Sequence, residues 1–178
     1  MAKAGVELLE RDGLAELTQC RIATAAGVSH GAPRHHFPTY AGLLAAIARE
    51  GIDDLNITNT TSLRELDAHT ALSQACRDVV SFAIQRPAMF ELIARHDLLV
   101  GAAENLRATT SQWLHAPTER MREIHPGVDE RHAVALWAGV QGLGTMLGRR
   151  SAEAITTDEI VPDSILDILI EGVIHTAT

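Results

Sequence analysis

Hydrophobic residues recur at helical spacing along nearly the whole chain. Ala4, Leu8 and Leu9 give an N-terminal helix one apolar face, and Asp12 and Gly13 end that helix. No segment shows the alternation of hydrophobic and polar residues that is typical of a half-buried strand. The pattern therefore predicts an all-α protein of about nine helices.

Capping residues, glycines and prolines divide the chain into these helices. Thr61 or Ser62 is expected to cap one long helix, Pro87 lies in the first turn of the next, and Asp129 caps a later one. We expect the longer helices over residues 40–59, 63–85, 87–96, 101–124, 130–150 and 162–175. The polar residues 56–70 are the best candidate for a joint, and we expect a head of residues 1–50 and a body of residues 51–178.

Two short helices separated by a tight turn follow the first helix. Thr18 is the expected N-cap of one and Ser29 of the other, and Gly27 between them can adopt a positive φ. The turn reads AGVS, from Ala26 to Ser29. A short pair of this kind is typical of a helix–turn–helix, whose second helix lies in the major groove of DNA.

The charge distribution allows a polyanion to approach this part of the chain. The first fifty residues contain five Lys or Arg and five Asp or Glu, so the net charge of −8 lies in residues 51–178. The segment Ile22–Phe37 contains no acid, and Gly31 and Ala32 add little side-chain bulk. A DNA backbone could therefore come close to the short third helix, which Pro33 keeps short.

The segment Leu8–Gly51 resembles the DNA-binding head of the TetR-type transcriptional regulators. It carries a Thr-led helix that ends in I-A-x-x-A-G-V-S, then x-His-Phe, then a helix with a Leu-Leu pair. Arg34 replaces the usual Tyr, and Tyr40 stands where Lys is usual. The resemblance implies that the DNA backbone contacts Thr18, Arg21, Arg34, His36 and Tyr40, and that base edges face Ser29, His30, Ala32 and His35. It also implies a cytoplasmic repressor that binds double-stranded DNA at a palindromic operator.

The body shows a weaker resemblance to the C-terminal domains of the same family. The segment Ala135–Gly148 retains a Trp and has Gln141 where a His is common, and Phe82–Ala94 resembles the segment before the pocket helices. We expect a small, largely apolar effector, although each lining residue taken singly fits simple core packing equally well. The candidate ligand-binding residues are Phe82, Met89, Phe90, Ile93, His96, Trp113, Met121, Trp137 and Gln141.

The last two helices carry the pattern of a subunit interface. Gly139, Gly142, Gly144 and Gly148 reduce the bulk of one helix, and apolar residues cover more than one face of the segment Pro162–Ile174. An intramolecular core would explain part of this pattern. We favour a homodimer through these two helices, because a two-fold protein matches a palindromic site.

Other classes of function have little support in the sequence. No apolar run is long enough to span a membrane, and Ser73 and Ser81 lack a nucleophile motif, so we expect neither a membrane protein nor an enzyme. We expect no cofactor and no metal, because His35 and His36 are adjacent on a helix and point apart. Cys20 and Cys76 are expected to be buried or half-buried thiols. The alternatives are a helical enzyme that uses His96 or His115, and a protein-interaction adaptor without DNA binding.

Overall fold

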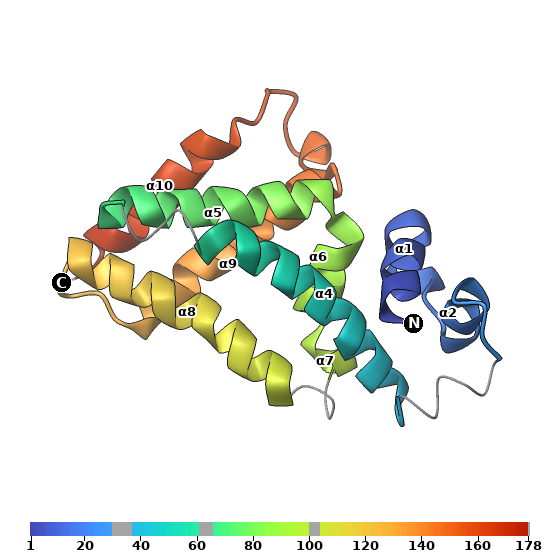
Figure 1. Cartoon of the computed structure of the whole chain (residues 1–178). Coiled ribbons are helices and arrows are strands. Elements are labelled where there is room, and N and C mark those ends of the chain that lie inside the picture. Colours follow the sequence, from blue (N-terminus) through green and yellow to red (C-terminus); the bar gives the residue numbers. More distant parts are fainter. Residues whose placement is uncertain (30–36, 61–65, 100–103, 178) are drawn as a thin grey trace. The chain divides into compact units, whose positions relative to one another are not determined.

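The computed structural model describes residues 1–29, 37–60, 66–99 and 104–177. For residues 56–60, 104–110, 112 and 113 it describes the backbone alone. The described residues form nine α-helices and two short 3₁₀ helices, and none of them lies in a strand (Figure 1). The predicted all-α class is therefore confirmed. The helices are α1 Ala2–Asp12, η1 Leu14–Glu16, α2 Gln19–Ala25, α4 Tyr40–Thr60, α5 Ala68–Gln85, α6 Pro87–Ala94, α7 His96–Leu99, α8 Glu104–Ile124, α9 Glu130–Gly148, η2 Ser151–Ala154 and α10 Pro162–His175.

The chain divides into two compact units, neither of which is continuous in sequence. The first unit comprises Met1–Asp54 and Arg86–Ala108, and the second comprises Leu55–Gln85 and Thr109–Thr178. Helix α6 thus packs with the N-terminal helices, and α4 contributes residues to both units. The expected division into a DNA-binding head of 1–50 and a ligand-binding and dimerisation body of 51–178 remains a prediction.

The first unit is built around α1, α2, α4 and α6. Gly5 of α1 lies so close to α4 that an added Cβ would be 2.4 Å from Cδ1 of Ile47. Gly13 ends α1 with a φ of 82°, and its N–H donates to the carbonyl of Leu9. Burial of apolar side chains holds these helices together. The core includes Leu8, Leu9, Leu17, Ile22, Leu43, Leu44, Ile47, Met89 and Leu92.

The second unit is a bundle in which α5 packs along α9 and α10 packs on both. Gly139 allows α9 and α10 to approach closely, because an added Cβ would be 2.8 Å from Cδ2 of Leu169. Asp129 caps α9, as expected: its carboxylate accepts from the backbone N–H of Arg131 at 2.9 Å. A hydrogen bond from the Arg131 guanidinium lowers the pKa of Asp129. The core includes Leu72, Val80, Leu136, Val140, Leu166 and Ile170.

Several expected boundaries differ from the structure. Helix α5 begins at Ala68 and is capped by Asp67, whose carboxylate accepts from the N–H of Thr70 at 3.0 Å; the expected caps at 61 and 62 lie outside the described residues. The helix expected over 87–96 ends at Ala94, and Arg95 separates it from α7. Cys20 is exposed and Cys76 buried, so the expectation of burial is wrong for Cys20.

Candidate functional site

The chain leaves α2 through the sharp turn expected from its sequence. Gly27 has a φ of 67°, and its N–H donates to the carbonyl of Thr24 at 3.1 Å. The N–H of Val28 donates to the carbonyl of Ala23 at 3.0 Å. Val28 and Ser29 are both exposed. Ser29 is therefore presented at the surface of the first unit.

Five of the predicted DNA contacts belong to the segment that follows this turn. His30, Ala32, Arg34, His35 and His36 lie outside the described residues. Their roles at base edges and phosphates stay predictions.

Thr18 and Arg21 lie together at the start of α2. The Thr18 hydroxyl accepts from the backbone N–H of Arg21 at 3.4 Å, which confirms Thr18 as the N-cap. The Arg21 guanidinium forms ion pairs with Asp12 and, at 2.6 Å, with Glu16. Its side chain remains 40 % exposed, so a phosphate could reach it, but the phosphate would compete with two carboxylates for the same donors.

Tyr40 has a structural role that sequence reasoning did not identify. Its hydroxyl donates to the backbone carbonyl of Leu17 and so links the start of α4 to the residue before the N-cap of α2. Partial burial raises the pKa of Tyr40, which keeps the hydroxyl protonated. Because a phenol has one hydrogen to donate, a hydrogen bond to phosphate requires Tyr40 to release Leu17.

Arg86 is a second residue that no local pattern in the sequence singles out. It lies at the N-cap position of α6, where its Nε donates to Glu10 of α1 at 2.8 Å and its Nη1 donates to Asp54 of α4 at 2.6 Å. Its side chain is only 23 % exposed. Arg86 therefore connects three helices of the first unit, a role that depends on partners far away in sequence.

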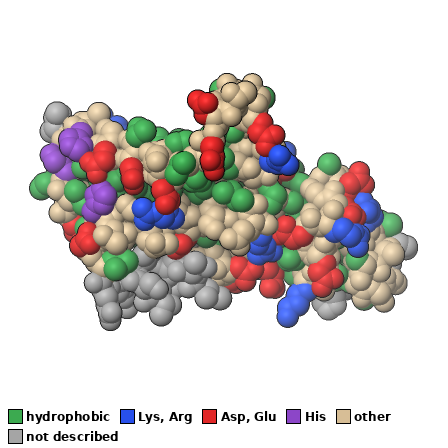
Figure 2. All heavy atoms as spheres, turned by 90° about the horizontal axis from the view of Figure 1, so that it is seen from above, with side chains coloured by type: hydrophobic (Ala, Val, Ile, Leu, Met, Phe, Trp, Pro, Cys, Tyr) green, Lys and Arg blue, Asp and Glu red, His purple; other side chains and the backbone are tan. Residues whose placement is uncertain are grey.

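Basic side chains of the described residues are largely matched with acids. Besides Arg21 and Arg86, Arg11 pairs with Asp12 at 2.8 Å. On the face shown in Figure 2, blue Lys and Arg side chains lie beside red Asp and Glu side chains, with green hydrophobic side chains between them. A DNA-binding surface on the described part of the head would therefore contain few Lys or Arg side chains that are not already paired with an acid.

The candidate ligand-binding residues are divided between the two units. Met89, Phe90, Ile93 and His96 belong to the first unit, and Phe82, Met121, Trp137 and Gln141 belong to the second. Met89, Phe90 and Met121 are buried and His96 is exposed; the side chain of Trp113 lies outside the described residues. None of these residues lines a pocket of about 250 Å³ that lies between α5 and α10.

Helices α9 and α10 present apolar and small residues to the surface. Val134 is 50 % exposed and Ile168 is 71 % exposed. Ala135, Ala138 and Gly142 are also exposed, and an added Cβ at Gly142 or Gly172 would meet no atom within 4 Å. Gly139 faces Leu169 of the same chain. Part of the glycine pattern therefore serves the packing of α9 against α10 within one chain rather than contact with a second subunit.

The described part of the chain contains neither a clustered metal site nor a membrane-spanning helix. No group of three or more His, Cys, Asp or Glu residues there is arranged to hold a metal ion. Among the same residues, no helix is both long enough and apolar enough to cross a bilayer.

Comparison with known proteins gives matches only among solved structures. No protein-family model matches the chain, and no curated protein does. BioQ of Mycobacterium smegmatis is 20 % identical over 98 % of this chain and 95 % of its own, with a TM-score of 0.72. A structure of BioQ with its natural double-stranded DNA operator has the same coverage, 19 % identity and a TM-score of 0.69.

Two further solved structures are regulators of the TetR type. A TetR-like transcriptional regulator from Rhodococcus sp. RHA1 is 14 % identical over 97 % of this chain and 90 % of its own, with a TM-score of 0.71. TetR-Q116A from Acinetobacter baumannii AYE, in complex with minocycline, is 19 % identical over 99 % and 96 %, with a TM-score of 0.64. The chain therefore has the fold of the TetR-like transcriptional regulators.

Proposed function

We propose that the chain is a DNA-binding transcriptional regulator whose N-terminal head binds an operator. The observation that carries this proposal is the turn after α2, where Gly27 has a positive φ and leads the exposed Ser29 into the predicted third helix. The fold supports it, because a protein of the same fold has been solved on its DNA operator. In this arrangement the third helix enters the major groove.

The proposed contacts to DNA fall into two groups. Arg34 and His36, with Thr18, Arg21 and Tyr40, bind phosphates and set the position of the head. Ser29, His30, Ala32 and His35 face the base edges, where the Ala32 methyl group can contact a thymine methyl group. Since Arg21 and Tyr40 have partners within the first unit, Arg34 is the proposed main phosphate contact.

We further propose that the protein is a repressor that a small, largely apolar effector releases from DNA. The effector would bind among the candidate ligand-binding residues and would favour one arrangement of the body helices over another. Helix α4 contributes to both units, so a shift of this helix would change the separation of the heads in a dimer. The solved complex of TetR-Q116A with minocycline supports a small-molecule site in a protein of this fold.

A homodimer through α9 and α10 completes the proposal. The exposed side chains of Val134 and Ile168, and the open space at Gly142 and Gly172, are suited to contact with the same two helices of a second chain. Two heads held at a fixed distance would match a palindromic operator.

Fluorescence anisotropy with labelled DNA from the region upstream of the protein's own gene tests the DNA proposal. Saturable binding that weakens steeply between low and moderate salt is expected, because phosphate contacts release counterions. Arg34→Ala should weaken binding about tenfold on every sequence and reduce the salt slope by about one. Arg120→Ala is the matched control, because Arg120 lies in α8 of the second unit and pairs with Glu123.

Three results would contradict parts of this proposal. Absence of saturable binding to any upstream fragment would favour the adaptor alternative. A change of base preference in Arg34→Ala would move Arg34 from the phosphate group to the base group. A ligand that binds tightly but leaves operator affinity unchanged would exclude the release mechanism.

A further inference from the structure

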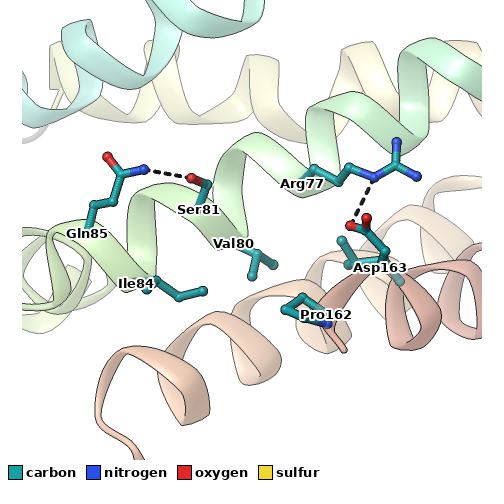
Figure 3. A pocket seen from close by; sticks show the side chains of 8 residues that line it. Arg77, Val80, Ser81, Ile84, Gln85, Pro162 and Asp163 are labelled. Atoms are coloured by element: carbon teal, nitrogen blue, oxygen red, sulfur yellow. Dashed lines mark hydrogen bonds and ion pairs between the residues drawn. The ribbon is translucent and has the colours of Figure 1, made fainter. Parts of the chain in front are cut away.

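A pocket between α5 and α10 lies entirely within the second unit. Its volume is about 250 Å³. Val80 and Ile84 point from α5 toward Pro162 at the start of α10 and form apolar walls (Figure 3). Leu166, one turn further along α10, also lines the pocket and is buried. The pocket thus has an apolar interior, and it does not include any of the candidate ligand-binding residues.

Polar groups line the two ends of this pocket. At one end, the amide nitrogen of Gln85 donates to the hydroxyl of Ser81 at 2.8 Å, so this pair presents no net charge. At the other end, Nε of Arg77 donates to Oδ1 of Asp163 at 3.0 Å (Figure 3). Arg77 and Asp163 are the charged residues among those that line the pocket.

The bond between Arg77 and Asp163 leaves much of the guanidinium unused. It involves Nε alone, and among the described residues no second acceptor bonds to the two terminal nitrogens of Arg77. The Arg77 side chain is 36 % exposed, whereas that of Asp163 is 62 % exposed and better solvated. A planar guanidinium with free terminal hydrogens is suited to bind a carboxylate through two parallel hydrogen bonds.

We propose that this pocket binds a small amphipathic carboxylate, with its acid group on Arg77 and its apolar chain between Val80, Ile84 and Pro162. The volume lies below the ~300–1,000 Å³ of typical ligand pockets, which favours a short chain of about six to eight carbons. The acid group binds the terminal nitrogens of Arg77, and Asp163 turns toward solvent. The site is separate from the proposed effector residues, and its occupation does not depend on DNA binding.

Calorimetric titration of the full chain with octanoate tests this proposal, and octanamide serves as the neutral counterpart. One octanoate per chain is expected, and octanamide should bind at least about tenfold more weakly because it lacks the charge. Arg77→Gln should reduce octanoate binding to the level of octanamide. Asp163→Asn should strengthen octanoate binding, since it removes a competing carboxylate. Ile84→Trp should block both probes, because Ile84 is 44 % exposed and a larger side chain there can occupy the pocket.

The control variant is Arg120→Gln, which removes an arginine of the second unit outside the pocket and should leave octanoate binding unchanged. If Arg77→Gln fails to fold, Ile84→Trp still decides the question. The proposal is overturned if straight-chain carboxylates from butanoate to decanoate show no saturable binding, or if Ile84→Trp binds octanoate as the parent does. Because the titration contains no DNA, its failure and the failure of the proposed regulatory function are distinguishable.

Discussion

The hydroxyl of Ser73 is buried within α5 without a hydrogen-bond partner among the described residues. A serine inside a helix often donates to the carbonyl four residues earlier, but Ser73 makes no such bond. A buried polar group without a partner costs about 1–3 kcal/mol of stability. Ser73 is therefore a residue that lowers the stability of the fold.

Ser73→Ala should raise the free energy of unfolding by about 1 kcal/mol, because it removes the unpaired hydroxyl and improves helix propensity. Urea unfolding followed by circular dichroism measures the change. Ser81→Ala is the control: Ser81 is exposed on the same helix, so its replacement should alter stability by no more than about 0.5 kcal/mol. A loss of stability in Ser73→Ala would show that the hydroxyl has a partner.

The two cysteines should differ sharply in reactivity. Burial raises the pKa of the Cys76 thiol to about 12, so almost no thiolate forms at pH 8, whereas Cys20 is exposed. Ellman's reagent should modify one thiol rapidly in the native protein and the second only after unfolding. The Cys20→Ser variant should lack the rapid phase; equal rates for both thiols would contradict the burial of Cys76.

Residues with local roles could be predicted from the sequence, and residues with distant partners could not. The cap at Thr18, the turn at Gly27 and the cap at Asp129 follow from rules that act within a few residues. The ion pairs of Arg86 join α6 to α1 and α4, and the Tyr40 hydroxyl reaches Leu17, 23 residues away. No local pattern specifies such pairs, because they depend on how the helices pack.

At the scale of elements, the crossing of α1 and α4 depends on the absence of one side chain. A Cβ at Gly5 would lie 2.4 Å from Cδ1 and 2.8 Å from Cγ1 of Ile47. Both residues are buried, so neither helix can shift without disturbing the core. The distance between the two helices is therefore set at Gly5.

Gly5→Ala should destabilise the protein by about 1 kcal/mol, since overpacking of about 1–3 kcal/mol exceeds the gain in helix propensity. Ile47→Val shortens the opposing side chain and should cost about 1 kcal/mol alone. The double variant should lose less than the two single losses together, which urea unfolding can measure. Strict additivity of the two core changes would refute the close contact between Gly5 and Ile47.

Helix boundaries were predicted well where a strong breaker stands and poorly elsewhere. Pro87 and Pro162 each lie at the first position of a helix, as expected. The break at Arg95 has no proline or glycine to mark it, so the sequence indicated that the helix continues to His96, whereas α6 ends at Ala94. Pro117 lies inside α8 without ending it, which shows that packing can outweigh a local breaker.

At the scale of the whole molecule, the fold was predictable because the motif in residues 8–51 combines several independent signals. The glycine turn, the cap and the apolar spacing agree with one another, and the solved structures confirm the resulting fold. The ligand-binding residues were harder to predict, because apolar side chains at helical spacing serve core and pocket alike. The complete burial of Met89 and Met121 fits the core.

The proposed dimer gives a prediction at this scale. Ile168→Glu places a charge on the exposed face of α10 and should convert a dimer to a monomer, because an unpaired charge in an apolar interface is costly. Size-exclusion chromatography with light scattering measures the mass. Ile155→Glu is the matched control, since Ile155 is 76 % exposed but lies outside α9 and α10. A parent protein with the mass of one chain would exclude the interface.

The contact between Gly139 and Leu169 limits which substitutions the protein can accept at these two positions. Because a Cβ at 139 would lie 2.8 Å from Leu169, larger residues at 139 require smaller residues at 169. A combinatorial library randomised at both positions and selected for folded protein should therefore recover pairs whose volumes compensate each other. Glycine at 139 would tolerate many partners, whereas alanine or serine there would be recovered mainly with valine or alanine at 169.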